Sequence, residues 1–169
     1  MILSSEQTST LAGLIASDAL SNGQLAILRR LDPTQTLPPE VWRLIGEIKL
    51  PGEAAERAVA GLLGLMAQAR IAGTPQPIGR ALAAEPGEKT AYAEARFVRL
   101  LRARGLSTVM HEARQVVKWC VTHGRVVRFT GYHGFAEFIL AAATEAGDAE
   151  TIGHTIARDY FRRPAATQA

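Results

Sequence analysis

The stretch EARFVRLLRARG, residues 94–105, places four arginines within nine residues. A guanidinium group is planar and permanently charged, and it donates paired hydrogen bonds to phosphate oxygens. The chemistry that this spacing offers is therefore binding of a phosphate backbone. Within residues 96–128, eight basic side chains accompany a single acid, Glu112, so this segment carries a net charge of +7 while the remainder carries −4. A protein polarised in this way is expected to attract a polyanion to one surface.

The other reactive side chains form no catalytic or metal-binding pattern. The run HEAR at His111 resembles the start of the HExxH zinc motif, but position 115 is Gln, and Cys120 is the only cysteine. GxSxG, GxxxxGK[ST] and GxGxxG motifs do not occur in the sequence. We therefore predict no catalytic residue, no metal and no cofactor, and we expect the histidines to be surface or capping residues. An enzyme would need a site assembled from distant positions.

The elements that must position the arginines are predicted to be helices, because apolar residues recur with helical spacing throughout the chain. A first helix around Leu11 is expected to stop at Asn22-Gly23, and another begins at Pro38-Pro39 and runs toward Pro51-Gly52. Further helices are predicted for residues 24–31, 53–72, 78–84, 135–146 and 149–162. RVVRF, residues 125–129, is interpreted as a connector and PAATQA as a frayed tail. The predicted fold class is all-α, a compact bundle of about eight helices.

Two small subdomains are expected, residues 1–86 and 87–169, with a soft boundary at Pro86-Gly87. The single cysteine excludes an internal disulfide framework, and the first ten residues do not resemble a signal peptide. No apolar stretch approaches about 18 residues, which argues against a membrane span. These features predict a cytoplasmic protein.

Two consecutive helices are predicted to present basic faces. In the arginine helix, Phe97 and Leu100 share the apolar side, while arginines 96, 99 and 102 lie opposite. The next helix is expected to be capped by Ser107 or Thr108, to run through Thr122, and to place Arg114 and Lys118 one turn apart on its polar side. These cations could follow a phosphate backbone, or they could simply form the solvated side of amphipathic helices.

The two tryptophans are assigned different environments. Trp42 falls among positions predicted to be in the core, whereas Trp119 lies on the polar side of its predicted helix. Trp119 is therefore a candidate either for stacking on bases or for contacting a partner protein.

Five segments, in order along the chain, together suggest a family. They are NGQLAILRR at 22–30, IGRALA at 78–83, ARFVRLLRAR at 95–104, the arginine of HEARQVV at 114, and IARDYFRR at 156–163. In this arrangement the chain resembles the CasB family, the small subunit of the type I-E CRISPR surveillance complex Cascade. The resemblance implies an all-helical protein without enzymatic activity. It also implies partners: guide RNA, target and displaced DNA, other Cascade subunits, and a second copy arranged head to tail.

The resemblance also implies which residues contact nucleic acid. Arg30, Arg102 and Arg114 match the family's basic positions and are the first candidates. Arg29, Arg80 and Arg96 also match basic positions, but each could instead form an internal ion pair, for example with Glu94 or Asp159. Arg99 and Lys118 are candidates from the helical-face argument alone.

One departure from the family and two alternative functions remain open. The segment AAAT at 141–144 is neutral where relatives often carry basic residues, and Arg125 and Arg128 could compensate. A helix-turn-helix regulator would use residues 107–122 as a recognition helix and would prefer one palindromic duplex. A protein-binding scaffold would pair the arginines with an acidic surface.

Overall fold

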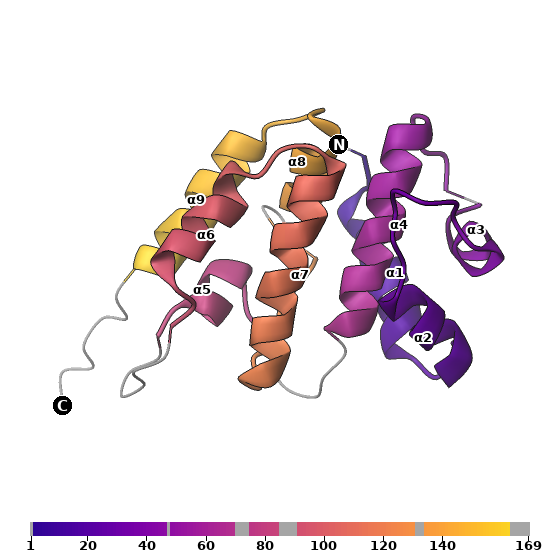
Figure 1. The fold of residues 1–169 in the computed structure, drawn as a ribbon, viewed down its shortest axis with the longest axis horizontal. Coiled ribbons are helices and arrows are strands. Elements are labelled where there is room, and N and C mark those ends of the chain that lie inside the picture. The colour runs from indigo at the N-terminus through magenta and orange to yellow at the C-terminus, as the bar shows by residue number, and fades with distance from the viewer. Residues whose placement is uncertain (1, 47, 70–74, 85–90, 131–133, 163–169) are drawn as a thin grey trace.

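The computed structural model describes residues 2–46, 48–69, 75–84, 91–130 and 134–162. This part of the chain contains nine helices and no β-strand, so the predicted all-α fold is confirmed (Figure 1). The helices are α1 (Ser5–Ala16), α2 (Asn22–Arg29), α3 (Pro39–Ile45), α4 (Glu53–Gln68), α5 (Ile78–Leu82), α6 (Glu94–Arg102), α7 (Leu106–Thr122), α8 (Phe135–Thr144) and α9 (Ala149–Phe161).

Helix α4 is the central element of the fold. Eleven of its 16 residues are buried, as expected for a helix surrounded by others. It contacts α1, α2 and α3 on one side and α7 and α8 on the other. Gly64 allows close packing here, because a Cβ atom at this position would lie 2.9 Å from the carbonyl oxygen of Leu28 in α2.

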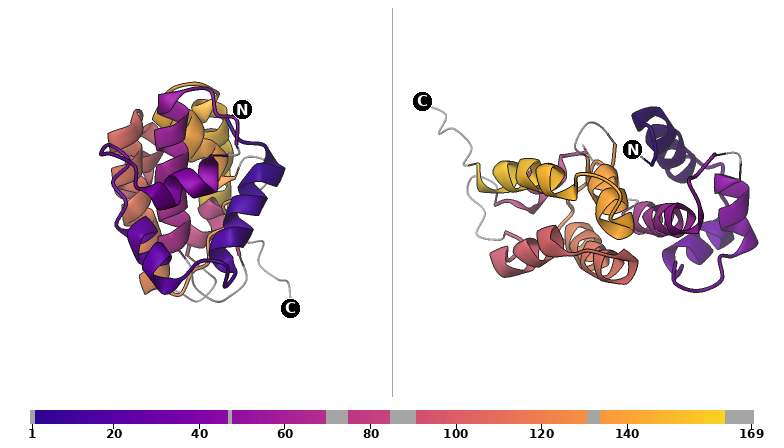
Figure 2. Two further views of the ribbon diagram at one scale, coloured as in Figure 1. Left: turned by 90° about the vertical axis from the view of Figure 1, so that its right-hand side faces the viewer. Right: turned by 90° about the horizontal axis from the view of Figure 1, so that it is seen from above.

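The helices after α4 form two layers. Seen from above, α6 and α7 lie along one side of the molecule, and α8 and α9 lie along the other (Figure 2). Helix α2 is on the same side as α6 and α7, whereas α1 is on the side of α8 and α9. The short helix α5 packs mainly against α9. The side formed by α2, α6 and α7 is the one to which Arg30, Arg102 and Arg114 belong.

Asn22-Gly23 does not end a helix, contrary to the prediction. These residues form the first turn of α2, because Ser21 and Gln24 make a capping box: the Gln24 N–H donates to Ser21 Oγ at 3.2 Å, and the Ser21 N–H donates to Gln24 Oε1 at 2.9 Å. Helix α1 ends earlier, at Ala16. Asn and Gly are typical of helix ends, but here the capping box of Ser21 and Gln24 starts a helix at this position.

Other helix ends also differ from the prediction. Helix α7 begins at Leu106, one residue after Gly105, whose φ of 77° favours glycine, so neither Ser107 nor Thr108 is its N-cap. Helix α3 ends at Ile45 rather than continuing toward Pro51. Segment 125–129 is a connector as predicted, joined to Gln76 by two backbone hydrogen bonds of 2.8 Å.

Two expectations concern residues that the structure does not describe. The break at Pro86-Gly87 and the tail at 164–169 both lie outside the described residues. The division into subdomains 1–86 and 87–169 therefore stays a prediction. Among the described residues, no helix combines the length and the apolar character needed to cross a bilayer.

Candidate nucleic-acid interface

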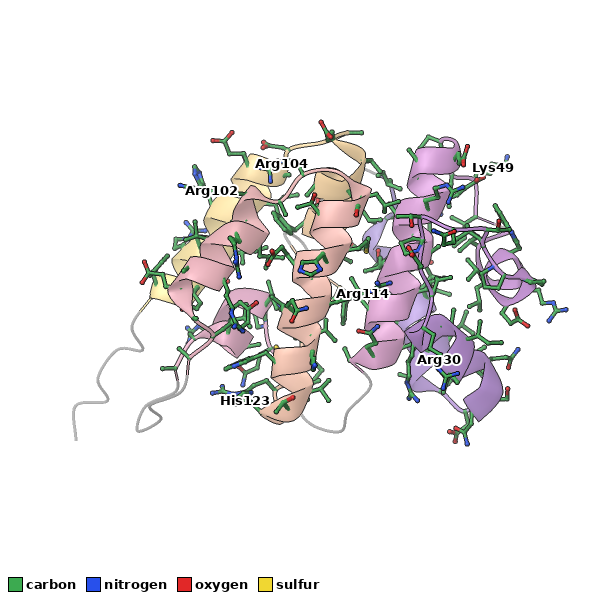
Figure 3. All side chains as sticks on the ribbon, in the orientation of Figure 1. Arg30, Lys49, Arg102, Arg104, Arg114 and His123 are labelled. Atoms are coloured by element: carbon green, nitrogen blue, oxygen red, sulfur yellow. The ribbon has the colours of Figure 1, made fainter. Side chains whose placement is uncertain are left out.

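Three helices bring the first-choice arginines to one side of the molecule. Arg30 directly follows α2, Arg102 is the last residue of α6, and Arg114 lies in the middle of α7. The three side chains are labelled in Figure 3, and Figure 2 shows that their helices share a side. We call this side the basic face; the candidate cations that its helices supply are Arg30, Arg96, Arg99, Arg102, Arg114 and Lys118.

Helix α6 supplies three of these cations because of its strict amphipathic pattern. Phe97 and Leu100 are completely buried, while arginines 96, 99 and 102 are exposed at intervals of three residues. Arg99 and Arg102 lie in the last turn, where a positive charge also interacts favourably with the helix dipole. The predicted orientation of this helix is confirmed.

Helix α7 supplies two further cations of the basic face, Arg114 and Lys118. Its buried side is made by Val109, Met110, Ala113, Val116, Val117 and Cys120. Lys118 is exposed, and Arg114, one turn earlier, is half-buried. The two residues therefore lie on the same side of the helix but differ in how far they reach into solvent.

An open groove of about 700 Å³ runs between α6 and α7. Arg99 and Arg102 line it together with small and apolar side chains, and Glu94 and Glu112 contribute carboxylates. Arg99 Nε lies 3.9 Å from Glu112 Oε1, and the side chains are 63% and 13% exposed, respectively. The one acid of this charged segment is thus directed at a cation of the basic face.

Three of the eight candidate residues contact the protein itself. Arg29 Nε donates to the Ala67 carbonyl oxygen at 3.1 Å, Arg114 Nη2 donates to the Leu31 carbonyl oxygen, and Arg99 approaches Glu112. The other five have exposed side chains that make no hydrogen bond or ion pair within the described residues: Arg30, Arg80, Arg96, Arg102 and Lys118. The suggested internal pairing with Glu94 or Asp159 is therefore not formed by Arg80 or Arg96 in this part of the chain.

Not all of these residues share the basic face. Arg80 is exposed on α5, which packs mainly on α9, so the fold does not bring it beside Arg30. Arg29 directs its Nε into the contact with α4. The structure thus groups six of the eight candidates and separates two.

Asp32 introduces a negative charge two residues after Arg30. The Thr34 backbone N–H at 3.0 Å and the Thr34 hydroxyl at 2.7 Å both donate to Asp32 Oδ1. These bonds hold the pKa of Asp32 below its ordinary value, and the nearby positive charge of Arg114 acts in the same direction. The carboxylate therefore stays ionised at the edge of the basic face.

Sequence reasoning placed Trp42 wrongly and overlooked Gln68. Trp42 is 44% exposed rather than buried in the core. Trp119 is half-buried, packing edge-on against Tyr92 with 5.6 Å between ring centroids and stacking on His123 at 4.2 Å. Gln68, which donates to the Arg29 carbonyl oxygen at 2.9 Å, is not among the residues that the sequence singles out. No local pattern distinguishes this glutamine from any other helical one.

The two connector arginines differ in accessibility. Arg125 is only 8% exposed, so the expectation that it replaces basic residues missing from 141–144 does not fit its burial. Arg128 is exposed and lines a small pocket near Gly79. Of the two, only Arg128 is accessible to a large polyanion.

The remaining reactive side chains do not gather. Within the described ranges, no group of three or more His, Cys, Asp or Glu residues could hold a metal ion. His111, His123 and His154 are exposed, and His123 is the C-cap of α7, while His133 lies outside the described residues. Burial raises the pKa of the Cys120 thiol to about 12, which disfavours the nucleophilic thiolate.

The fold and this site define an all-helical protein that collects exposed cations on one side. The family model for the CRISPR-associated protein Cse2 matches residues 24–161 of the 169, and the chain belongs to this family. The resemblance to the CasB family of Cascade small subunits is thereby confirmed, and with it the assignment as a CRISPR-associated Cascade subunit. Neither the comparison with curated proteins nor the comparison with solved structures returned a match.

Proposed function

We propose that this protein is a non-catalytic Cascade subunit whose basic face binds nucleic acid through phosphate groups, without sequence specificity. In this role it supports pairing of the guide RNA with target DNA and stabilises the displaced strand of the R-loop. The observation that carries the proposal is the grouping of Arg30, Arg102 and Lys118. They belong to helices that share one side of the fold, and their side chains are exposed and make no hydrogen bond or ion pair among the described residues.

Weak, distributed contacts are sufficient for this role. The RNA–DNA duplex formed in an R-loop is about as stable as the DNA duplex that it replaces, so modest contacts to the backbone can shift the balance. Contacts to phosphates carry no sequence information, and their strength comes largely from releasing counterions. Six cations spread over α2, α6 and α7 suit such binding better than the reading of one base sequence.

The proposal ranks the candidate residues by what their side chains are free to do. Arg30, Arg102 and Lys118 come first, followed by Arg96 and by Arg99, whose contact with Glu112 is long at 3.9 Å. Arg114 uses one of its five N–H donors on Leu31 and keeps others for a phosphate. Arg80 and Arg29 rank last, because Arg80 lies apart and Arg29 points its Nε at α4.

The proposal also includes the setting of the protein. Its partners are guide RNA, target and displaced DNA, the other Cascade subunits and a second copy of this chain, in the cytoplasm. Residues 1–86 and 87–169 act as the two subdomains of the small subunit.

The test is binding of the purified full chain to unrelated single-stranded and duplex DNA over a salt series. Wild type is compared with Arg30→Ala, Arg102→Ala and Arg114→Ala. Arg158→Ala is the charge-matched control, because Arg158 belongs to α9, on the other side of the molecule. A variant that binds one phosphate fewer on a single strand should show a slope of log K against log salt that is shallower by about 0.7.

We expect binding that is indifferent to sequence, weakens with salt and has a shallower slope in the Arg30 and Arg102 variants but not in the control. A strong preference for one duplex would support the helix-turn-helix regulator instead. Equal weakening in all variants, including Arg158→Ala, would show that net charge rather than the basic face determines binding. The same variants, reconstituted into Cascade, should shorten the lifetime of the R-loop.

A further inference from the structure

The C-terminal end of α2 is held on one side by α4. Gln68 Nε2 donates to the Arg29 carbonyl oxygen at 2.9 Å, and Arg29 Nε donates to the neighbouring Ala67 carbonyl oxygen at 3.1 Å. The end of α2 and the end of α4 thus each donate a side-chain hydrogen bond to the backbone of the other, although the bonded residues are 38 and 39 positions apart in the sequence. Below them, Leu28 is buried and its carbonyl oxygen lies against Gly64 of α4.

The same end of α2 is held on its other side by α7. Arg114 Nη2 donates to the carbonyl oxygen of Leu31, 83 positions earlier in the chain. Arg30 therefore lies between two residues whose carbonyl oxygens are each bonded by a side chain of another helix. Its own N–H donates within α2, to Ala26 and Ile27. The Arg30 side chain makes no hydrogen bond or ion pair with the described residues.

Such bonding changes how a helix end behaves. The last carbonyl groups of a helix lack partners within it, and helix ends ordinarily fray. Here the carbonyl oxygen of Arg29, the last residue of α2, is bonded by Gln68 of α4, and that of Leu31, which is buried just after the C-cap Arg30, is bonded by Arg114 of α7. The backbone that carries Arg30 is thereby fixed relative to α7 and its cation Lys118.

We propose that Gln68 and Arg114 are positioning residues, which hold Arg30 in register with the cations of α6 and α7 for binding a phosphate backbone. This inference rests on the proposed function of the basic face. We call the three hydrogen bonds from Gln68, Arg29 and Arg114 the α2 clamp. The clamp raises affinity because a cation already in place loses less conformational entropy when it binds.

Gln68 allows positioning to be separated from charge, because it is neutral. Gln68→Met keeps a side chain of similar length but removes the donor to Arg29. In the full chain, we expect its affinity for oligothymidylate to fall about three- to tenfold. The salt slope should stay near that of wild type, since no cation is removed. Gln115→Met, the same change at an exposed position of α7, is the matched control and should bind like wild type.

A double-mutant cycle tests whether Gln68 acts through Arg30. In an Arg30→Ala background, Gln68→Met should cause little further decrease in affinity, because the side chain that it positions is gone. A general structural role would weaken binding equally in both backgrounds, and that additive result would overturn the proposal. A wild-type affinity for Gln68→Met alone would overturn it as well.

Amide hydrogen exchange without nucleic acid provides a second measurement. Gln68→Met and Arg114→Ala should each speed exchange at the end of α2, around residues 30 and 31, while leaving α8 protected. Unchanged exchange there would overturn the clamp even if binding fell. Binding that is insensitive to Arg30→Ala, with faster exchange in the Gln68 variant, would instead refute the proposed function and leave the clamp as a structural feature only.

Discussion

Arg99 and Glu112 face each other across the groove between α6 and α7, with Arg99 Nε 3.9 Å from Glu112 Oε1. Glu112 is mostly buried, whereas the Arg99 side chain is 63% exposed and can turn outward. The contact is long and partly solvated, so it contributes little to stability. Its main effect is to place a negative charge directly beside one cation of the basic face.

Glu112→Gln should therefore strengthen nucleic-acid binding. The substitution keeps the shape of the side chain, removes repulsion of phosphates and releases Arg99 from its partner. We expect affinity for single-stranded DNA to rise about two- to fivefold at low salt and to approach the wild-type value at high salt, where exposed charges are screened. Fluorescence anisotropy across a salt series measures this change.

The control for this prediction is Glu6→Gln on α1, which removes the same charge on the opposite side of the molecule. An equal rise in both variants would mean that total charge, rather than the position of Glu112, limits affinity. A weaker affinity in Glu112→Gln would mean that Glu112 holds Arg99 in its binding position.

Two glycines should respond in opposite directions to substitution by alanine. A Cβ atom on Gly79 in α5 would collide with the Ile156 carbonyl oxygen and lie 2.9 Å from the Tyr160 nitrogen of α9. We expect Gly79→Ala to lower the free energy of unfolding by about 1–3 kcal/mol. Gly13, in the middle of α1, meets no atom within 4 Å, so Gly13→Ala should raise stability by about 0.5–1 kcal/mol. Urea denaturation followed by circular dichroism measures both, and an unchanged Gly79→Ala variant would contradict the close packing of α5 on α9.

The helices and their polar sides could be predicted because they depend on local spacing. The buried positions Phe97 and Leu100 and the exposed arginines between them follow directly from a period of 3.6 residues. The start of α2 also has a local signal, since Ser21 and Gln24 form a capping box, but the adjacent Asn22-Gly23 pair is more typical of a helix end and hides it.

The internal bonds of the candidate arginines could not be predicted in this way. Arg114 bonds to Leu31, which lies 83 positions earlier in the chain. The local sequence around either residue contains no signal for this contact. Trp42 illustrates the same limit: its helical position matches the core stripe, yet α3 is short and lies at the edge of the fold, which leaves the residue 44% exposed. Tertiary packing decides both outcomes.

Two tyrosine hydroxyl groups should differ in their effect on stability. Tyr160 Oη donates to the Tyr92 carbonyl oxygen at 2.6 Å, so Tyr160→Phe leaves a buried acceptor unbonded and should cost about 1–3 kcal/mol. Tyr92 is 1% exposed, and its hydroxyl has no hydrogen bond among the described residues. Tyr92→Phe should therefore leave stability unchanged or raise it by about 1 kcal/mol. Thermal denaturation compares the two variants, and a larger decrease for Tyr92→Phe would contradict the unpartnered hydroxyl.

Cys120 should be inert in the folded protein. It is 1% exposed, and burial raises the pKa of its thiol to about 12. At about pH 8 the nucleophilic thiolate is therefore scarce as well as inaccessible. Native protein should react with a disulfide reagent at least about a hundredfold more slowly than protein in denaturant, because reaction requires opening of the structure. Rapid labelling of the native chain would show that α7 opens locally around Cys120.

The same thiol should make stability depend on alkaline pH. Because the pKa of Cys120 is raised from 9.0 to about 12 on folding, the folded state binds this proton more tightly than the unfolded state. The associated stability is fully present below about pH 9 and is lost as pH rises toward 12. The free energy of unfolding should therefore fall above about pH 9 by up to about 1.4 kcal/mol per pH unit from this group.

The Cys120→Ala variant tests this prediction. It should be less stable than wild type at neutral pH, because it leaves a cavity, but its stability should depend less on pH between about pH 9 and 10. This window lies below the pH range in which the raised pKa values of Tyr92 and Tyr160 contribute. Parallel profiles for wild type and Cys120→Ala in urea denaturation would contradict a thiol that stays protonated in the folded state.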